Sequence, residues 1–187
     1  MDELERLAEA ESSLVRRLAE AFRPGPLTLV LHKKSITPDI VTAGLPTVAV
    51  HIPAHRVARR LIKLAQCPVA APSANPFGRI SPTTATRVAS FLGDHVDVIL
   101  DGGPCSMGVV STILSLVDET RPVLLRPGAI PVEDIRRIIG DVVDVPAELV
   151  NFNNGIFLFS GKGQKGQVKI GSENAPVFTV SAWVFWL

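Results

Sequence analysis

The chain has 187 residues, of which 47% are hydrophobic and 20% are charged, and its formal net charge is +1 at pH 7. A chain of this size and apolar content can form one compact domain with a sizeable core, and a disordered polyelectrolyte is excluded. The near-neutral balance also excludes a protein that coats nucleic acid through bulk positive charge, while a local basic patch stays open.

The cysteine content and the chain ends indicate the compartment. Cys67 and Cys105 are too few for a disulfide framework or a zinc site, which favours a reducing environment. Residues 1–10 do not resemble a signal or transit peptide, and the apolar stretch 177–187 is too short to cross a bilayer. We therefore expect a soluble, cytoplasmic protein with no membrane partner.

Helical and strand patterns alternate along the first part of the chain. Helices are predicted over 4–22 with a restart at 12–13, over 55–66, over 84–92 and over 132–139. Strands are predicted at 27–31, 47–52, 69–71 (buried), 96–100, 112–117 and 123–125. In helix 55–66 the inward residues are predicted to be Val57, Leu61, Ile62 and Leu64. Interleaved helices and strands indicate an α/β fold, a mixed sheet with helices packed on it.

The amino-acid composition changes near residue 150. Residues 1–150 contain all thirteen arginines, whereas 151–187 contain both tryptophans and four of the five asparagines. We therefore predict a domain over 1–145 and an atypical tail over 146–187. The tail is either an appended segment of different origin or a β-rich subdomain, with short strands at 156–160, 167–170 and 177–180.

The loop after strand 69–71 carries an unusual run of small and hydroxyl residues. It reads Ala71-Pro-Ser-Ala-Asn75 and continues to Ser81-Pro-Thr-Thr84. Small side chains let a phosphate approach backbone N–H groups, and hydroxyls add hydrogen bonds. The alternative for Ser81 or Thr83 is a helix N-cap.

Two later loops place an acidic residue and a basic residue at strand ends. Asp101-Gly-Gly-Pro-Cys105 follows strand 96–100, where Asp101 is either a site carboxylate or the cap of a turn. Arg126-Pro-Gly128 follows strand 123–125, and a planar, always charged guanidinium at a rigid turn suits a phosphate or carboxylate.

Other features favour structural roles. The Pro24–Thr28 segment is interpreted as a rigid turn, and Cys67 as a core residue. His51 and His55 flank Pro53 and so do not form a two-histidine zinc face on a helix. His32-Lys-Lys34 is interpreted as a solvated strand end, with RNA contact as the alternative.

Seven short sequence motifs, taken in chain order, resemble those of the YrdC-type threonylcarbamoyl-adenylate synthase family. The resemblance runs from about Leu14 to Gly140. Its strings are Pro24-Gly-Pro-Leu-Thr-Leu-Val-Leu31, Val41-Thr-Ala-Gly-Leu-Pro-Thr-Val-Ala-Val50, Ala71-Pro-Ser-Ala-Asn75, Ser81-Pro-Thr83, Asp101-Gly-Gly-Pro-Cys105, Ser111-Thr112 and Leu125-Arg-Pro-Gly128. The family has a twisted mixed sheet around a concave, positively lined cavity. It joins threonine, bicarbonate and ATP into threonylcarbamoyl-adenylate, with release of pyrophosphate, for the threonylcarbamoyladenosine modification of tRNA.

The resemblance implies specific site residues. It assigns Thr47, Ser73, Ser81 and Arg126 to ATP binding, and Ala71 and Ser111 to threonine binding. It singles out no catalytic side chain. It implies Mg²⁺ with the nucleotide, although no carboxylate cluster identifies metal ligands, and partners in the tRNA threonylcarbamoyl-transfer machinery.

The chain departs from the family pattern in three ways. The family begins with a further segment of about fifty residues that bears Pro-Thr-x-Thr-x-Tyr-Gly-Leu and Lys-x-Arg strings, and neither string occurs here. His51 stands where an arginine is usual, and Val110 where a glutamate is usual. Histidine is shorter and largely neutral at pH 7, so a contact to a substrate carboxylate should weaken.

These departures keep an alternative function open. The alternative is a catalytically impaired module that retains affinity for a nucleotide, or for tRNA or double-stranded RNA. A third reading, the related carbamoyl-transfer domain of hydrogenase maturation proteins, is disfavoured because the zinc-finger cysteines that accompany that domain are absent.

Overall fold

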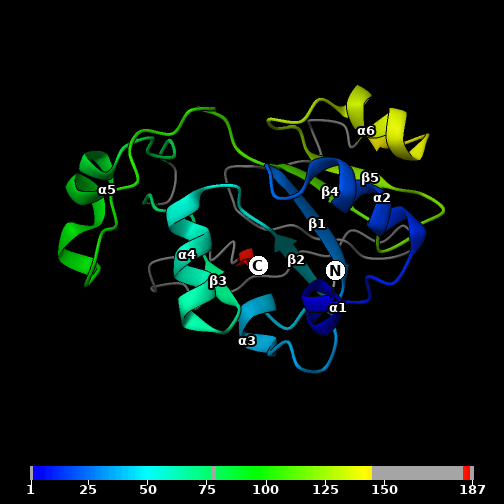
Figure 1. The fold of residues 1–187 in the computed structure, drawn as a ribbon, viewed down its shortest axis with the longest axis horizontal. Coiled ribbons are helices and arrows are strands. Elements are labelled where there is room, and N and C mark those ends of the chain that lie inside the picture. The colour runs from blue at the N-terminus through cyan, green and yellow to red at the C-terminus, as the bar shows by residue number, and fades with distance from the viewer. Residues whose placement is uncertain (1, 77–78, 145–182, 186–187) are drawn as a thin grey trace, which may run out of the picture.

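The computed structural model describes residues 2–76, 79–144 and 183–185 (Figure 1). Their strands form a seven-stranded mixed sheet in the order β3-β7-β2-β1-β4-β5-β6. The strands are β1 Leu27–His32, β2 Thr47–His51, β3 Val69–Ala71, β4 Thr112–Ser115, β5 Val123–Arg126, β6 Val143–Asp144 and β7 Trp183–Phe185. The helices are α1 Asp2–Leu7, α2 Ser13–Phe22, α3 Asp39–Thr42, α4 Arg56–Ala65, α5 Ala85–Leu92 and α6 Val132–Ile139, with a 3₁₀ turn at Gly93–His95. The expected α/β fold with a mixed sheet is confirmed.

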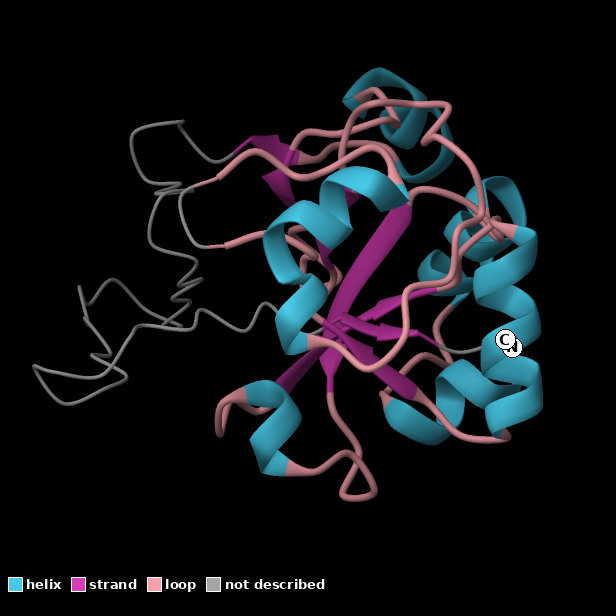
Figure 2. Cartoon of the chain, turned by 90° about the vertical axis from the view of Figure 1, so that its left-hand side faces the viewer, coloured by secondary structure: helices cyan, strands magenta, loops and turns pink. Residues whose placement is uncertain are grey.

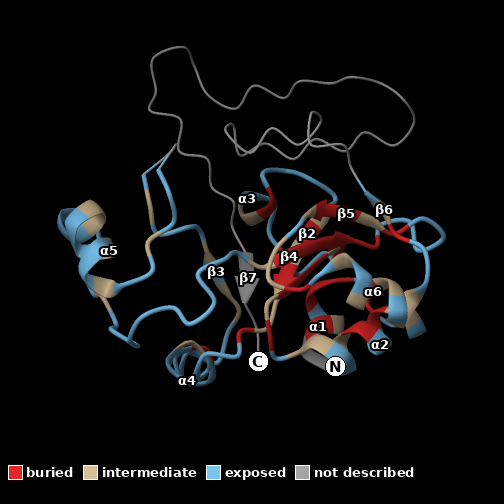
Figure 3. Cartoon of the chain, turned by 90° about the horizontal axis from the view of Figure 1, so that it is seen from above, coloured by how far each residue is buried: buried red, intermediate tan, exposed pale blue. Residues whose placement is uncertain are grey.

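The hydrophobic core lies between the central strands and three helices. Helices α1, α2 and α6 pack together beside β1, β4 and β5, where the buried residues concentrate (Figures 2 and 3). Helix α2 begins after Ser12, whose Oγ accepts a hydrogen bond from the backbone N–H of Val15 at 3.2 Å, and thereby places Val15 and Leu18 in the core. The predicted restart of the N-terminal helix at Ser12 is confirmed.

Strand β1 is the centre of the sheet. It pairs antiparallel with β2 and parallel with β4, so both of its edges are hydrogen-bonded. Leu27, Leu29 and Leu31 are fully buried, as a strand covered by neighbours on both sides requires. The register of these pairings determines which loop residues meet at each end of the sheet.

Strand β7 comes from the C-terminal tail and lies between β2 and β3. It pairs parallel with β2 and antiparallel with β3. The tail strands predicted at 156–160, 167–170 and 177–180 lie outside the described residues, and the domain boundary at 145 stays a prediction. Strand β7 was not expected from the sequence.

Residues 82–110 extend away from the main sheet, with α5 at the far end of the molecule (Figures 1 and 3). Helix α5 has no buried residue. The strand predicted at 96–100 is wrong: this segment has no strand structure, and Val98 and Leu100 are 71% and 55% exposed. An apolar run becomes a strand only where a neighbouring strand accepts its hydrogen bonds, and the described residues offer none there.

Three expectations of burial are also wrong. In α4 Ile62 is buried, but Val57, Leu61 and Leu64 are exposed, because this side of the helix has no described neighbour over it. Strand β3 is only partly buried, since it follows β7 at the edge of the sheet. Cys67 is exposed rather than in the core. No helix in the described part of the chain is long and apolar enough to cross a membrane.

Candidate functional site

Four polar residues form a row across one end of the sheet. Thr28 of β1 is in register with His51 of β2 on one side and with Ile113 of β4 on the other, and Ile113 is in register with Arg126 of β5. Ser111 immediately precedes β4. The row therefore runs His51, Thr28, Ser111, Arg126 across four adjacent strands.

Arg126 and Ser111 are joined by three hydrogen bonds. Arg126 Nε and Nη2 donate to the backbone oxygen of Ser111 at 3.2 and 2.8 Å, and Nη2 also donates to Ser111 Oγ at 3.1 Å. Both residues are half-buried. Burial lowers the pKa of Arg126 to about 10, so the guanidinium stays charged at neutral pH. This fixes a positive charge beside a hydroxyl at the end of the sheet.

The loop after β5 is held against the start of β4. The buried Thr112 Oγ1 donates to the backbone oxygen of Ile130 at 2.8 Å and accepts from its N–H at 2.9 Å. The N–H of Ala129 donates to the backbone oxygen of Val110 at 3.0 Å. A Cβ at Gly128 would come within 2.5 Å of backbone atoms of residues 110–112, so only glycine allows this approach. The Arg-Pro-Gly turn thus positions Arg126.

His51 is neutral and takes part in a hydrogen-bonded chain. Its Nδ1 lies 3.0 Å from the backbone oxygen of Leu27 and 3.2 Å from Thr28 Oγ1, and Thr28 Oγ1 lies 3.0 Å from Ser111 Oγ. Because a carbonyl oxygen only accepts, Nδ1 carries the ring proton. Burial lowers the pKa of His51 to about 4; the hydrogen bond to Leu27 acts in the opposite direction, and the positive charges of Arg23 and Arg126 lower the pKa further.

Sequence reasoning missed two residues of this site, Thr28 in the row and Arg23 beside it. Thr28 was interpreted as part of a turn, but it is a fully buried polar residue within an otherwise apolar strand, a signal the sequence does contain. Arg23, next to the same turn, lies within electrostatic range of His51. An arginine between an amphipathic helix and a proline gives no comparable sequence signal.

The other predicted site residues lie elsewhere. Thr47 begins β2 and His51 ends it, so the two are about 13 Å apart along the strand. Strand β3 runs antiparallel to β7, and β7 runs parallel to β2, so Ala71 and Ser73 lie towards the Thr47 end. The structure therefore brings Ser111 and Arg126 together, and it separates them from Thr47, Ala71 and Ser73. Ser81 is exposed in the loop before α5.

The contacts of the glycine-rich loops resolve two alternatives. Thr84, rather than Ser81 or Thr83, caps α5: its Oγ1 accepts from the N–H of Arg87 at 3.3 Å. Asp101 caps its own turn, because Oδ1 accepts from the N–H of Gly103 at 2.8 Å. The N–H of Cys105 donates to the backbone oxygen of Thr83 at 2.8 Å, which joins the two loops.

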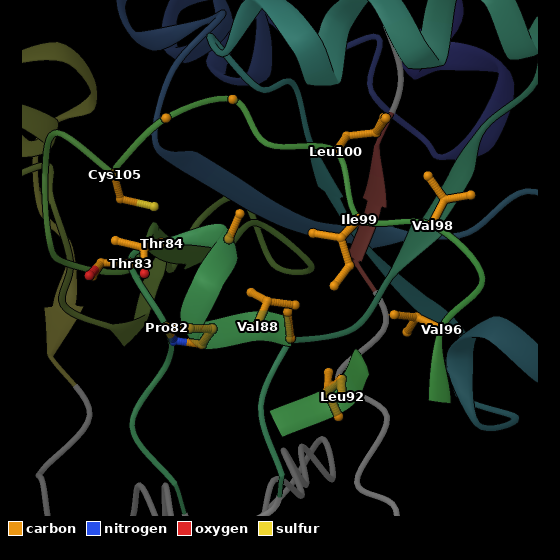
Figure 4. A pocket seen from close by; sticks show the side chains of 14 residues that line it. Pro82, Thr83, Thr84, Val88, Leu92, Val96, Val98, Ile99, Leu100 and Cys105 are labelled. Carbon is orange, nitrogen blue, oxygen red and sulfur yellow. The ribbon is translucent and has the colours of Figure 1, made fainter. Parts of the chain in front are cut away.

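These loops line an open cavity of about 360 Å³, which Figure 4 shows from close by. Its wall is largely apolar, with polar groups from Thr83, Thr84 and Cys105. None of the predicted site residues lines it. The cavity is therefore separate from the Ser111–Arg126 cluster.

The described residues contain no group of three histidine, cysteine or acidic side chains that could hold a metal ion. Strand β1 ends at His32, so the segment is a strand end as interpreted, but it is not fully solvated: the side chain of Lys33 is only 14% exposed and forms an ion pair with Asp39. Lys34 forms an ion pair with Glu11. His55 Nε2 lies 3.3 Å from the backbone oxygen of Gly102 and so connects α4 with the Asp-Gly-Gly loop.

The fold and this cluster define an α/β protein with a cationic site at one end of a mixed sheet. The model of the Sua5/YciO/YrdC family, described as "Telomere recombination", matches residues 1–128. The chain therefore belongs to this family.

Two curated relatives are named threonylcarbamoyl-AMP synthase. The protein from Pyrococcus abyssi is 47% identical over 146 residues, which are 78% of this chain and 43% of that protein. The protein from Bacillus subtilis is 45% identical over 144 residues, 76% of this chain and 41% of that protein. The chain thus spans about two fifths of the length of these relatives.

The structural comparisons agree. The crystal structure of Pyrococcus abyssi Sua5 in complex with L-threonine matches with a TM-score of 0.75 and 46% identity, over 79% of this chain and 43% of that chain. The structure of Escherichia coli YciO matches with a TM-score of 0.63 at 22% identity, over 72% of this chain and 65% of that chain, and supports the fold alone.

Proposed function

We propose that this chain acts in threonylcarbamoyl-AMP synthesis, in which threonine, bicarbonate and ATP give threonylcarbamoyl-AMP and pyrophosphate. The observation that carries the proposal is the Arg126–Ser111 contact, which holds a permanent cation beside a hydroxyl at the sheet end. The names of the two curated relatives support the same reaction. The activity would be that of a nucleotidyltransferase.

The proposed chemistry balances without a redox step. The amino group of threonine attacks bicarbonate, a C–N bond forms, and water leaves to give the carbamate. A carbamate oxygen then attacks the α-phosphorus of ATP, a P–O bond forms, and the bond to the β-phosphate breaks as pyrophosphate leaves. In such transfers the protein chiefly orients the reactants and stabilises negative charge.

Each predicted residue has a role in this proposal. Arg126 would stabilise the phosphates, and Ser111 would hydrogen-bond threonine. Ala71 would contribute its backbone on the threonine side. Thr47, Ser73 and Ser81 would donate hydroxyl hydrogen bonds to the nucleotide from the other end of β2 and from the loop beyond β3. A nucleotide that contacts both Thr47 on β2 and Arg126 on β5 must extend across β1 and β4, which lie between these strands.

Mg²⁺ is proposed to enter with the nucleotide. Because the described residues offer no cluster of acidic side chains, phosphate and water oxygens would supply most of its ligands. The product would serve the threonylcarbamoyladenosine modification of tRNA, and the partners would be the enzymes of that transfer in the cytoplasm.

Pyrophosphate release tests the proposal. Purified protein, ATP, bicarbonate and MgCl₂ are incubated with and without L-threonine, and pyrophosphate is measured. Threonine-dependent release, strongly reduced in Arg126→Ala at subsaturating ATP and retained in Arg121→Ala, is expected. Release that is absent, or equal without threonine, contradicts it.

One observation favours the alternative of a catalytically impaired nucleotide- or RNA-binding module. Thr47 begins β2, whereas the row that contains Arg126 crosses β2 at its last residue, His51, and Ser73 lies towards the Thr47 end. Such a module would bind ATP or tRNA without releasing pyrophosphate. Its tRNA affinity would fall steeply with added salt, because the phosphate backbone dominates such binding.

A further inference from the structure

Arg23 has a position unlike that of the other arginines described. It follows α2 directly, and its Nη2 donates to the backbone oxygen of Val50 at 3.2 Å. Its Nε and Nη1 are shielded from solvent and have no hydrogen-bond partner among the described residues. The guanidinium therefore lies inside the protein beside the strand that ends in His51, with donors uncommitted.

A buried guanidinium whose N–H groups have no acceptor lowers the stability of the folded protein. A buried N–H with no acceptor loses the hydrogen bonds that it makes with water, and a buried charge loses more. Desolvation lowers the pKa of Arg23 to about 10, which still leaves the group charged at neutral pH. A charged donor of this kind is satisfied best by an anionic acceptor.

None of the ion pairs among the described residues involves Arg23, so no acidic side chain in this part of the chain is paired with it. The titratable group within electrostatic range of Arg23 is His51, which is neutral at pH 7. Arg23 therefore places a cation near the β2 end of the row, with donors that no described residue accepts.

We propose that Arg23 binds the α-carboxylate of the amino-acid substrate, at the β2 end of the row, while Arg126 serves the phosphates at the β5 end. This inference rests on the proposed function. Both substrates carry oxyanions, but the carboxylate of threonine is not consumed in the reaction and needs a cation throughout. Neutral His51 supplies none.

Binding measurements on the full chain test this assignment. Calorimetry compares L-threonine with L-threoninol, which lacks the carboxylate, and with ATP. The variants are Arg23→Gln and, as a matched control, Arg16→Gln on the exposed face of α2. We expect Arg23→Gln to weaken threonine binding about tenfold or more, with threoninol and ATP affinities unchanged. Arg16→Gln should bind all three ligands normally.

The outcomes separate the two proposals. Unsubstituted protein that binds no threonine contradicts the proposed function itself. Normal threonine binding by Arg23→Gln, or a loss of ATP affinity instead, overturns the Arg23 assignment and leaves the function standing. If Arg23→Gln does not fold, the comparison of threonine with threoninol is made on the unsubstituted protein. Equal affinity for the two ligands overturns the proposal that the site recognises the carboxylate.

Discussion

Arg126 holds Ser111 by both its backbone and its side chain. The guanidinium donates to the backbone oxygen through two nitrogens and to Oγ through one of them. A contact of this kind orients the hydroxyl and the cation together, so that neither can turn away without breaking bonds to the other. The antiparallel pairing of β4 with β5 makes it possible, because it aligns the start of one strand with the end of the other.

Arg126→Ala should weaken ATP binding by about 1.5–3 kcal/mol, the contribution of a charge-assisted contact. Arg126→Lys should rescue little, because one ammonium cannot reproduce the planar set of donors. Isothermal calorimetry with ATP measures the change. Arg121→Ala, an exposed arginine in the turn before β5, is the control. ATP affinity unchanged by Arg126→Ala would refute the assignment.

His51 should make stability depend on pH. Its pKa falls from 6.5 to about 4 on folding, so the unfolded state binds the proton first as the pH drops. Above about pH 6.5 the buried, neutral His51 adds nothing unfavourable to the free energy of unfolding. As the pH falls from about 6.5 to about 4, protonation of the unfolded state lowers the free energy of unfolding, by about 3 kcal/mol in total.

His51→Asn, which keeps a side-chain donor, should flatten this part of the profile. Urea unfolding at a series of pH values gives the free energy of unfolding of each protein. His32→Asn, an exposed histidine on β1, should follow the unsubstituted curve. Parallel curves for His51→Asn and the unsubstituted protein would contradict the prediction.

Features set by short-range patterns could be predicted from the sequence. The Leu27–Leu31 strand follows from an apolar run interrupted only by Thr28, and α6 has the predicted bounds because Pro131 and Gly140 mark its two ends. Likewise Arg126 and Ser111 each stand out locally. Their mutual contact depends on the register of β4 against β5, which no local pattern contains.

Features set by distant neighbours could not be predicted. The apolar run from Val96 to Leu100 resembles a strand, yet no described strand pairs with it. The periodicity of α4 identified an apolar face but not whether anything covers it. The neutral state of His51 depends on burial and on two arginines that approach from other elements.

Gly128→Ala should destabilise the protein and disturb the site. The new Cβ would lie within 2.5 Å of the backbone of residues 110–112, which cannot move as a flexible side chain would. We expect a cost of about 3 kcal/mol, as for overpacking, and a fall in Tm of about 6–12 °C for a chain of this size. Gly93→Ala is the matched control, because a Cβ there meets no atom within 4 Å. Equal melting temperatures of the two variants would show that the turn can move.

Val184→Pro should release the two strands that β7 joins. Val184 is in register with Val50 of β2 and Ala70 of β3, and proline removes a backbone donor from a strand that has neighbours on both sides. Hydrogen exchange followed by mass spectrometry should show faster exchange in 47–51 and 69–71, by about tenfold where one hydrogen bond of about 1.4 kcal/mol is lost. Protection in β4, which does not contact β7, should persist. Val184→Ala keeps the backbone donor and serves as the control, so identical exchange in the alanine and proline variants would mean that β7 does not hold these strands together.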